Sequence, residues 1–299
     1  MRWKLLGSVL ILSAILAGIH HYRLDALVLH IWKTQVARHI LPDTALDLNR
    51  YRIAIEARAI EGIEDDLSGL TYNAATNTLF SVSNGKPLIF EIDLNGNLLR
   101  EIEVEGVRDM EGITHVEDNR YVVVDEYDQR IILVEIDANT RAIDAAKGLQ
   151  ISLGISATKN NKNFEGVSWD EKNQRLLVVK ERNPASIIEV TGFAGNASDS
   201  NRLRVSQIEP ASFARMKLRD FSSITYHNDS GNLLLLSDES RMAVEFDEDG
   251  RAISALALWR GFHGLKNNVP QAEGIALGPQ NRVYIVSEPN LFYVFNPAD

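Results

Sequence analysis

The hydrophobic pattern from about residue 50 to the C-terminus consists of short apolar runs separated by polar turns. In each unit a β-prone run is followed by a polar turn and by a second run that is apolar on both faces, as in a strand packed between sheets. A third apolar run and a more polar fourth run, such as 98–104 or 252–258, follow, with turns such as Asn95-Gly96 between them. Each unit is therefore predicted to be a four-stranded antiparallel sheet.

Variants of one short motif mark the start of the units. They are Asp66-Leu67-Ser68-Gly69-Leu70, Asp109-Met110-Glu111-Gly112-Ile113, Asn163-Phe164-Glu165-Gly166-Val167, Asp220-Phe221-Ser222-Ser223-Ile224 and Gln271-Ala272-Glu273-Gly274-Ile275. Successive copies are 43 to 57 residues apart, which is the repeat length of a propeller blade. The chain is therefore predicted to be all-β, a five-bladed β-propeller over residues 50–299. Six blades are the alternative if the segments 142–163 and 192–220 hide further strands.

The last unit lacks a fourth strand, because the sequence stops at Asp299 directly after the third run. A missing outer strand would leave an open sheet edge, which proteins avoid. The segment 51–57 alternates in polarity and precedes the first unit. We expect this N-terminal strand to close the last blade.

The N-terminus has the pattern of an export signal. Arg2 and Lys4 precede a mainly apolar run from Leu5 to Ile19. We expect residues 1–22 to be an uncleaved signal anchor, a single transmembrane segment with its positive end in the cytoplasm and the propeller on the other side. A cleaved signal peptide is the alternative. Residues 23–49 are predicted to hold an amphipathic helix over 24–40 and a linker, with the helix lying on the membrane or against the propeller.

Composition narrows the choice of partners. The formal net charge of −10 opposes binding to nucleic acid, and it favours small cations. The absence of cysteine excludes disulfides, thiolate metal sites and a cysteine nucleophile. No phosphate loop, zinc motif or nucleophile elbow is present, and His115 and His227 are interpreted as structural.

Acidic residues recur at two positions that a propeller brings together. The first strand of each blade lines the channel and the second runs antiparallel beside it, so the start of the first meets the end of the second at one rim. The first position holds Ser68, Glu111, Glu165, Ser222 and Glu273. The second position holds Asn84, Glu126, Glu181, Asp238 and Glu288.

Carboxylates crowded at one opening repel each other, and a bound cation relieves the repulsion. Ligands that offer only oxygen atoms favour a hard cation, Ca²⁺ before Mg²⁺. The predicted metal ligands are Glu111, Glu165, Glu273, Glu126, Glu181, Asp238 and Glu288. Further residues predicted to bind a ligand at this rim are Asp66, Asp109, Asp220, Asn84, Lys180, Arg182 and His263. The alternative is that the glutamates accept backbone N–H bonds from the next blade and hold the ring together.

The repeated Glu-Gly units behind a signal anchor resemble the SdiA-regulated family (YjiK/CarP group) of bacterial envelope proteins. The units that carry the resemblance begin at Asp66, Asp109, Asn163 and Ala272, and the likeness covers about residues 51–299. The resemblance implies a β-propeller related to NHL-repeat and phytase-like proteins, a place in the bacterial envelope and a link to calcium. Ser68 and Ser222 depart from the glutamate pattern, so the resemblance does not give a carboxylate on every blade.

Two functions are compatible with these features. The first is a membrane-anchored periplasmic propeller on the bacterial inner membrane, whose acidic rim binds Ca²⁺ and a small molecule or an envelope protein. The second is a metal-dependent hydrolase of a phosphoester or lactone, in which the cation polarises the substrate and activates water. A hydrolase would need a general base beside the metal and a basic residue such as Lys180 or Arg182 for an anionic substrate. No diagnostic spacing supports that arrangement, so binding is the preferred prediction.

Overall fold

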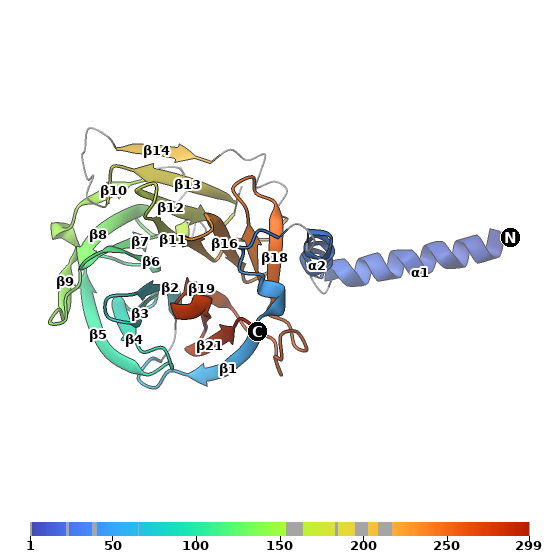
Figure 1. Ribbon diagram of the computed structural model, residues 1–299, viewed down its shortest axis with the longest axis horizontal. Helices are drawn as coiled ribbons and strands as arrows, with labels where there is room; N and C mark the ends of the chain where they lie inside the picture. Colours follow the sequence, from blue (N-terminus) through green and yellow to red (C-terminus); the bar gives the residue numbers. More distant parts are fainter. Residues whose placement is uncertain are drawn as a thin grey trace.

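Five sheets are arranged around a central channel in the part of the chain that the structure describes (Figure 1). The computed structural model describes residues 2–21, 24–37, 41–64, 66–153, 164–182, 185–194, 203–208 and 217–298. The inner strands contact one another in the cyclic order β2, β6, β11, β15, β19 and back to β2. The five-bladed propeller predicted from the repeats is therefore confirmed.

Each blade is formed largely by strands that follow one another in the sequence. Blade 1 consists of β2 (Leu67–Asn73), β3 (Thr78–Ser83), β4 (Leu88–Ile92), β5 (Leu98–Glu105) and β9 (Ala142–Asp144). Blade 2 consists of β6 (Met110–Glu117), β7 (Arg120–Asp125), β8 (Arg130–Glu135) and β10 (Gln150–Ser152). Blade 3 consists of β11 (Phe164–Asp170), β12 (Arg175–Lys180), β13 (Ser186–Thr191) and β14 (Arg204–Gln207). Blade 4 consists of β15 (Ser223–His227), β16 (Asn232–Ser237), β17 (Met242–Phe246) and β18 (Ala252–Ala257). Blade 5 consists of β19 (Ala272–Leu277), β20 (Val283–Ser287), β21 (Leu291–Asn296) and β1 (Arg52–Ala59).

The two long insertions supply outer strands instead of a sixth blade. In the segment 142–163, β9 adds to blade 1 in parallel with β5, and β10 is the outer strand of blade 2. In the segment 192–220, β14 is the outer strand of blade 3. The six-bladed alternative is therefore wrong, because the strands that the structure describes in these insertions complete existing sheets.

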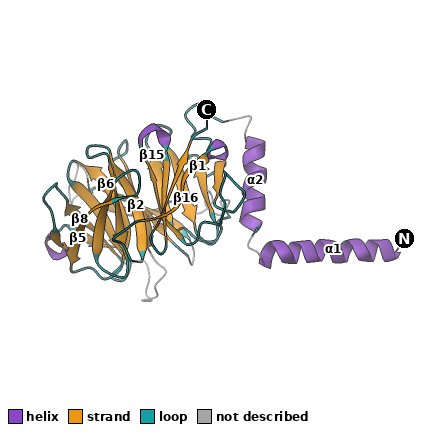
Figure 2. Ribbon diagram, turned by 90° about the horizontal axis from the view of Figure 1, so that it is seen from below, coloured by secondary structure: helices purple, strands orange, loops and turns teal. Residues whose placement is uncertain are grey.

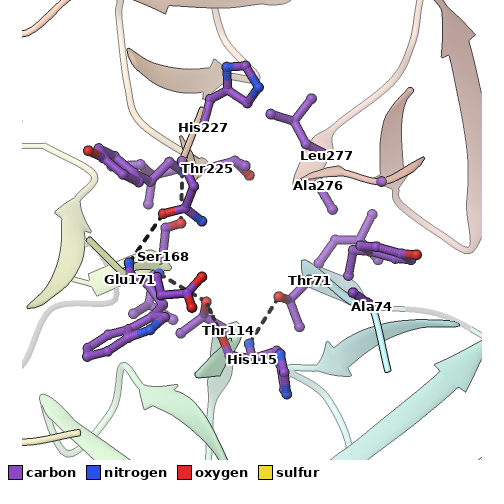
Figure 3. A pocket seen from close by; sticks show the side chains of 18 of the residues that line it. Thr71, Ala74, Thr114, His115, Ser168, Glu171, Thr225, His227, Ala276 and Leu277 are labelled. Carbon is purple, nitrogen blue, oxygen red and sulfur yellow. Dashed lines mark hydrogen bonds between the residues drawn. The ribbon is translucent and has the colours of Figure 1, made fainter. Parts of the chain in front are cut away.

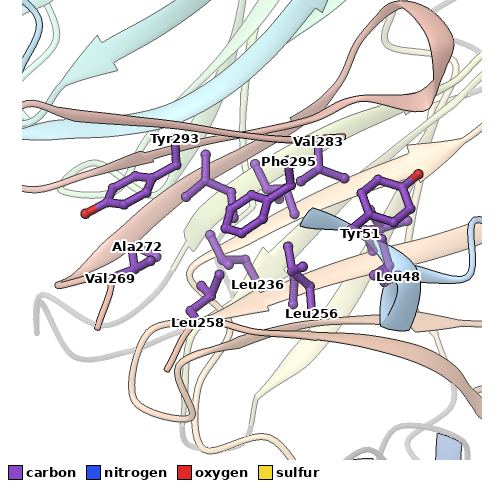
Figure 4. Close-up of a cluster of buried hydrophobic side chains, with 14 of the residues drawn as sticks. Leu48, Tyr51, Leu236, Leu256, Leu258, Val269, Ala272, Val283, Tyr293 and Phe295 are labelled. Carbon is purple, nitrogen blue, oxygen red and sulfur yellow. The ribbon is translucent and has the colours of Figure 1, made fainter. Parts of the chain in front are cut away.

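The outer strand of blade 5 comes from the other end of the propeller sequence. β1 pairs antiparallel with β21, so that Arg52 lies opposite Asn296 and Ala59 lies opposite Leu291. The segment before β1 packs between blades 4 and 5, where Leu48 and Tyr51 join a cluster of buried side chains from both sheets (Figure 4). This blade thus contains strands from both ends of the propeller sequence.

The glycine of the repeat lies where neighbouring inner strands approach each other closely. A Cβ atom on Gly112 would stand 2.4 Å from the Glu165 carbonyl oxygen, and one on Gly274 would stand 2.7 Å from the Gly69 carbonyl carbon. Real Cβ atoms do not tolerate such distances, so only glycine fits. The repeated glycine therefore serves the packing of the ring.

Two helices stand at one side of the ring among the described residues (Figure 1). They are α1 (Arg2–His21) and α2 (Asp25–Ala37), and α2 lies within the range predicted for the amphipathic helix. α2 packs against β18 of blade 4, with Ala26 and Leu27 buried. No helix in the described segments has both the length and the hydropathy that crossing a membrane requires. The signal-anchor role of residues 1–22 stays a prediction.

Candidate functional site

Backbone hydrogen bonds bring the two acidic sequence positions together at one end of the channel. The N–H groups of Asn84, Glu126 and Glu288 donate to the carbonyl oxygens of Asp66, Asp109 and Gln271 at 3.2, 2.8 and 3.0 Å. Each bond joins the residue after a second strand to the residue before an inner strand. We call this end of the channel, which carries residues 111, 126, 165, 181, 238, 273 and 288, the acidic end.

β-Bulges occur at the glutamates of the inner strands. The register of β6 with β7 shifts between Met110 and Gly112, and that of β19 with β20 shifts between Ala272 and Gly274. The register of β11 with β12 also shifts, between Phe164 and Val167. A bulge places an extra residue in one strand and changes the direction of its side chain. Glu111 and Glu273 are these extra residues, and Glu165 lies within the shifted segment.

Three carboxylates at the acidic end are close enough to share one ion. One ligand oxygen from each of Asp109, Glu111 and Glu126 lies within 4.8 Å of the other two. Glu111 and Glu126 are buried, and Asp109 is half-buried. Asn84 of blade 1 reaches the same group, since its Nδ2 donates to Glu111 Oε1 at 3.3 Å. Carboxylate and amide oxygens are the donors that Ca²⁺ prefers.

The carboxylates at this end disfavour one another's ionisation. Burial raises the pKa of Glu111 to about 8, and the charges of Asp109 and Glu126 add to the shift. Burial also raises the pKa of Asp109, with Asp125 contributing. The pKa of Glu165 lies well above its ordinary value because of burial and then the charges of four neighbours. These neighbours are Glu111, Glu126, Glu273 and Glu181.

Glu273 extends the same network to the other side of the ring. Burial raises its pKa well above the ordinary value, and nearby charges add to the effect. These charges belong to Asp238, Glu111, Glu288 and Asp220. Glu165 and Glu273 are half-buried. All seven carboxylates predicted as metal ligands therefore lie in one electrostatic network.

Two of the other predicted acids have structural partners at the turns. The Asp220 carboxylate accepts hydrogen bonds from the Ser237 hydroxyl and from the Glu239 N–H, the latter at 3.2 Å. Burial raises the pKa of Asp220 to about 6. The Asp66 carboxylate occupies the space beside Gly85, where a Cβ atom would stand 1.9 Å from Asp66 Oδ2. Both acids thus lie against the turn that follows the second strand of their blade.

The predicted basic residues and the last glutamate also have identified neighbours. Arg182 bonds Glu181 at 2.5 Å and Glu239 at 2.8 Å, so one guanidinium holds two carboxylates. Lys180 ends β12 and lies opposite Phe164 and Ser186 in the sheet. Glu288 Oε2 accepts a bond of 2.6 Å from Gln271 Nε2.

His263 does not belong to the rim, contrary to the sequence prediction. Its Nε2 accepts the Ala257 N–H at 3.1 Å, and its Nδ1 lies 2.9 Å from the Tyr51 carbonyl oxygen. These contacts fix the neutral ring with its proton on Nδ1, and burial lowers its pKa. His263 instead links the segment before β1 to β18.

Hydroxyl groups make the hydrogen bonds that join neighbouring inner strands. Thr71 Oγ1 accepts the His115 N–H at 3.0 Å, and Thr114 Oγ1 accepts the Trp169 N–H at 3.1 Å. Ser168 Oγ accepts the Tyr226 N–H at 2.9 Å. We call Thr71, Thr114, Ser168 and Thr225 the hydroxyl ring. Its sequence signal is a Thr or Ser two residues after the repeat glycine or serine, replaced by Ala276 in the fifth copy.

At the position before the repeat glycine or serine, blades 1 and 4 have a serine where the other three blades have a glutamate, and each serine bonds the next blade. Ser68 Oγ donates to the Glu111 carbonyl oxygen at 2.9 Å, and Ser222 Oγ donates to the Ala272 carbonyl oxygen at 2.7 Å. The serines at this position therefore brace the ring through their hydroxyls. The glutamates of the other three blades lie in the electrostatic network instead.

The hydroxyl ring lines a cavity at the opposite end of the channel (Figure 3). The cavity has a volume of about 300 Å³, and the ends of all five inner strands contribute to it. His115 and His227 line it, and both have partners: His115 Nε2 lies 2.9 Å from the Asp118 carbonyl oxygen, and His227 Nδ1 lies 2.7 Å from Ser230 Oγ. The predicted carboxylates do not line this cavity.

Comparison with known proteins places the chain in a family. A profile of the SdiA-regulated family matches residues 43–296. The chain belongs to the SdiA-regulated family. The matched region spans the propeller and the segment that leads into it, so the family resemblance of the Glu-Gly repeats is confirmed.

Comparison with solved structures finds similar chains at low sequence identity. A luciferin-regenerating enzyme is 12% identical with a TM-score of 0.52, over 82% of this chain and 95% of that chain. A chain of a nidogen/laminin complex is 15% identical with a TM-score of 0.48, over 75% and 73%. A streptogramin B lyase is 12% identical with a TM-score of 0.45, over 83% and 98%. At 12% identity, the similarity to the luciferin-regenerating enzyme shows a shared fold and nothing about function.

Proposed function

We propose that this SdiA-regulated propeller binds a divalent cation, Ca²⁺ in preference to Mg²⁺, at the acidic end of its channel. Asp109, Glu111 and Glu126 form the centre of the proposed site. The observation that carries the proposal is that their ligand oxygens lie within 4.8 Å of one another while the pKa of Glu111 is raised to about 8. Three acids this close either retain protons or share a cation.

The type of ion follows from the donors. The close group offers carboxylate oxygens, and Asn84, bonded to Glu111, can add an amide oxygen to the site if its side chain turns. Ca²⁺ accepts six to eight such oxygens in a flexible geometry, whereas Mg²⁺ requires a near-octahedral arrangement at shorter distances. Glu165 and Glu273, contributed by other blades, supply further negative charge to the same network. A large, flexible donor set favours Ca²⁺.

We also propose that α1 attaches the protein to the bacterial inner membrane, with the propeller in the periplasm. This proposal is supported by the exposed apolar surface of α1. Its exposed side chains include Val9, Ile11, Leu12, Ile15 and Leu16, each 52% exposed or more. Such a surface is stabilised by an apolar environment. A small molecule or an envelope protein is the proposed partner of the cation-loaded end.

A metal-dependent hydrolase acting on a phosphoester or lactone is the second proposal for the same end. It is favoured by Arg182, a basic group that lies between Glu181 and Glu239 and can hold an anionic substrate beside the metal. A general base is harder to assign. Asp220, whose pKa is about 6, already accepts bonds from Ser237 and Glu239. Binding is therefore preferred to hydrolysis.

The test is thermal unfolding of the full chain in mild detergent with Ca²⁺, with Mg²⁺ and with EDTA. At 100 times its Kd, an ion that binds only the folded state adds about 2.7 kcal/mol, or roughly 5 to 10 °C in a domain of this size. Glu111→Gln and Glu126→Gln should reduce the Ca²⁺ response. Glu101→Gln, an exposed glutamate on β5, is the matched control and should retain it. Equal melting temperatures under all three conditions would refute the site.

A further inference from the structure

α2 has one buried face and one exposed apolar face. The buried face consists of Ala26, Leu27, His30 and Thr34, each 7% exposed or less. The opposite face carries Val28, Trp32 and Val36, which are 54%, 66% and 60% exposed. Residues four apart lie on one side of a helix, so these three form a continuous row, which we call the α2 stripe. A helix that already buries one side against the protein thus has a second apolar side uncovered.

The orientation of the α2 stripe is fixed relative to the propeller. Ala26 belongs to the apolar cluster shared by blades 3 and 4, and the His30 ring packs edge-on against Phe246 with centroids 6.0 Å apart. Arg219, which precedes β15, bonds the Asp25 carboxylate at the start of α2 at 2.8 Å. Whatever covers the α2 stripe therefore also sets the orientation of the whole ring.

α1 continues the exposed apolar surface away from the propeller. The Leu24 N–H donates to the Ile19 carbonyl oxygen at 2.8 Å, which holds the end of α1 close to the start of α2. α2 lies along the side of the ring, and α1 extends away from it (Figure 2). Seen down the channel, α1 runs outward in the plane of the ring, whereas α2 is seen nearly end-on (Figure 1). The α2 stripe faces away from blade 4, towards the side from which α1 leaves.

We propose that the α2 stripe docks on the surface of a lipid bilayer, so that the propeller stands on the membrane by the edge of blade 4. The proposal rests on the membrane attachment proposed for α1. Tryptophan concentrates at membrane–water interfaces because its ring is apolar and its N–H is polar, and Trp32 is the centre of the stripe. A helix lying in the interface inserts its apolar side about 5 to 10 Å into the headgroup region.

This arrangement has a consequence for the channel. With α2 lying in the membrane surface, the channel runs parallel to the bilayer, because α2 runs along the channel direction (Figure 1). The acidic end and the cavity at the hydroxyl ring then open sideways, and neither is covered by lipid. A soluble cation or partner can therefore reach either end of the channel while the protein stays docked on the membrane.

Fluorescence quenching of Trp32 tests the proposal on the full chain. Trp3→Phe, Trp169→Phe and Trp259→Phe leave Trp32 as the sole tryptophan, and the matched control retains only Trp169, which is 6% exposed. Each chain is reconstituted into phosphatidylcholine vesicles with or without bromine near the top of the acyl chains. Bromine should reduce the Trp32 emission by about twofold, as expected for an interfacial indole, and leave the Trp169 emission unchanged.

Two further variants connect the signal to the α2 stripe. Val28→Glu with Val36→Glu, in the chain that retains only Trp32, should abolish the quenching. Leu99→Glu in the same chain should preserve it, because Leu99 is similarly exposed at 52% but lies on β5 of blade 1. Equal effects of the two changes would contradict docking through the stripe.

Vesicle flotation separates the failure of docking from the failure of attachment. If the chain floats with the vesicles but Trp32 is quenched no more than Trp169, docking is refuted and attachment by α1 stands. If the chain does not float, both proposals are refuted. If Trp32 emission changes with protein concentration but not with bromine, a second copy of the chain covers the stripe and lipid docking is wrong.

Discussion

The two ends of the channel are formed by the same five inner strands but differ in chemistry. At the acidic end, Glu111 and Glu273 occupy β-bulges and join a network of carboxylates with raised pKa values. At the opposite end, Thr71 and Thr114 lie in regular register and accept backbone N–H groups from the next blade. In blades 2 and 5 the bulged start of the inner strand thus contributes a carboxylate to the network, whereas Ser68 and Ser222 at the same position of blades 1 and 4 bond the next blade. One repeat position can therefore provide either structural support or candidate chemistry, depending on its residue.

The largest predicted effect is a pH dependence of the free energy of unfolding in the absence of divalent ions, which arises mainly from the carboxylates of the acidic end. The folded pKa of Glu111 is raised from 4.5 to about 8, and that of Asp220 is raised from 3.8 to about 6. The unfolded chain therefore binds fewer protons than the folded chain between pH 5 and 8, so stability falls as the pH rises through this window. Between pH 5 and 8 we expect the free energy of unfolding to fall by several kcal/mol in EDTA. The fall should be smaller in Ca²⁺, because the ion replaces the protons on the carboxylates. Melting curves from pH 5 to 8 in EDTA and in Ca²⁺ measure the two losses. A melting temperature in EDTA that does not change with pH would contradict the raised pKa values of Glu111 and Asp220.

Adding a methyl group to an inner strand, between the two ends of the channel, should force neighbouring blades apart and destabilise the fold. Gly112→Ala places a Cβ atom against the Glu165 carbonyl oxygen, where only 2.4 Å is available. We expect a loss of about 3 kcal/mol in urea unfolding, since neither backbone can move without its blade. Ser223→Ala is the reference change, because the fourth blade already accommodates a Cβ atom at this position and the change removes only the long hydrogen bond, 3.4 Å, from the Ile275 N–H to Ser223 Oγ. A cost for Gly112→Ala no larger than that of this reference change would show that the strands can separate.

Removing one hydroxyl should weaken the ring and leave cation binding unchanged. Thr114→Val keeps the shape of the side chain but leaves the Trp169 N–H without its acceptor at 3.1 Å. An unsatisfied buried donor costs about 2 kcal/mol. Thr114→Ser should recover most of this loss, and Ca²⁺ titration should give the same affinity for all three proteins. A weaker affinity for Thr114→Val would show that the two ends are coupled.

Removing one carboxylate at the acidic end should stabilise the folded state, in contrast to the changes above. Glu165→Gln removes the cost of burying a carboxylate and its repulsion from Glu111, Glu126, Glu273 and Glu181, so in EDTA at pH 8 the folded state should gain about 1 kcal/mol. Ca²⁺ binding should weaken, while Glu101→Gln changes neither quantity. Destabilisation by Glu165→Gln in EDTA would instead support the alternative in which the glutamates brace the blades.

The repeats alone predict five blades in preference to six, the first three strands of each blade and the one end of the channel at which the acidic residues gather. Five spaced motifs and short apolar runs were sufficient, because blade formation depends on local strand pairing and on a recurring glycine that lets inner strands approach. The pairing of Asn84, Glu126 and Glu288 with the residues before the inner strands also follows from antiparallel geometry.

The partners of individual side chains, in contrast, depend on the closed three-dimensional ring. Bulges at Glu111 and Glu273 depend on packing against the partner strand and the next blade, which no local pattern encodes. Ser68 bonds a carbonyl group 43 residues away, and His263 bonds the Tyr51 carbonyl 212 residues away. Whether a polar side chain braces the ring, caps a turn or joins a charged network depends on such distant neighbours, because side-chain partners are set by the closed ring and not by the repeat.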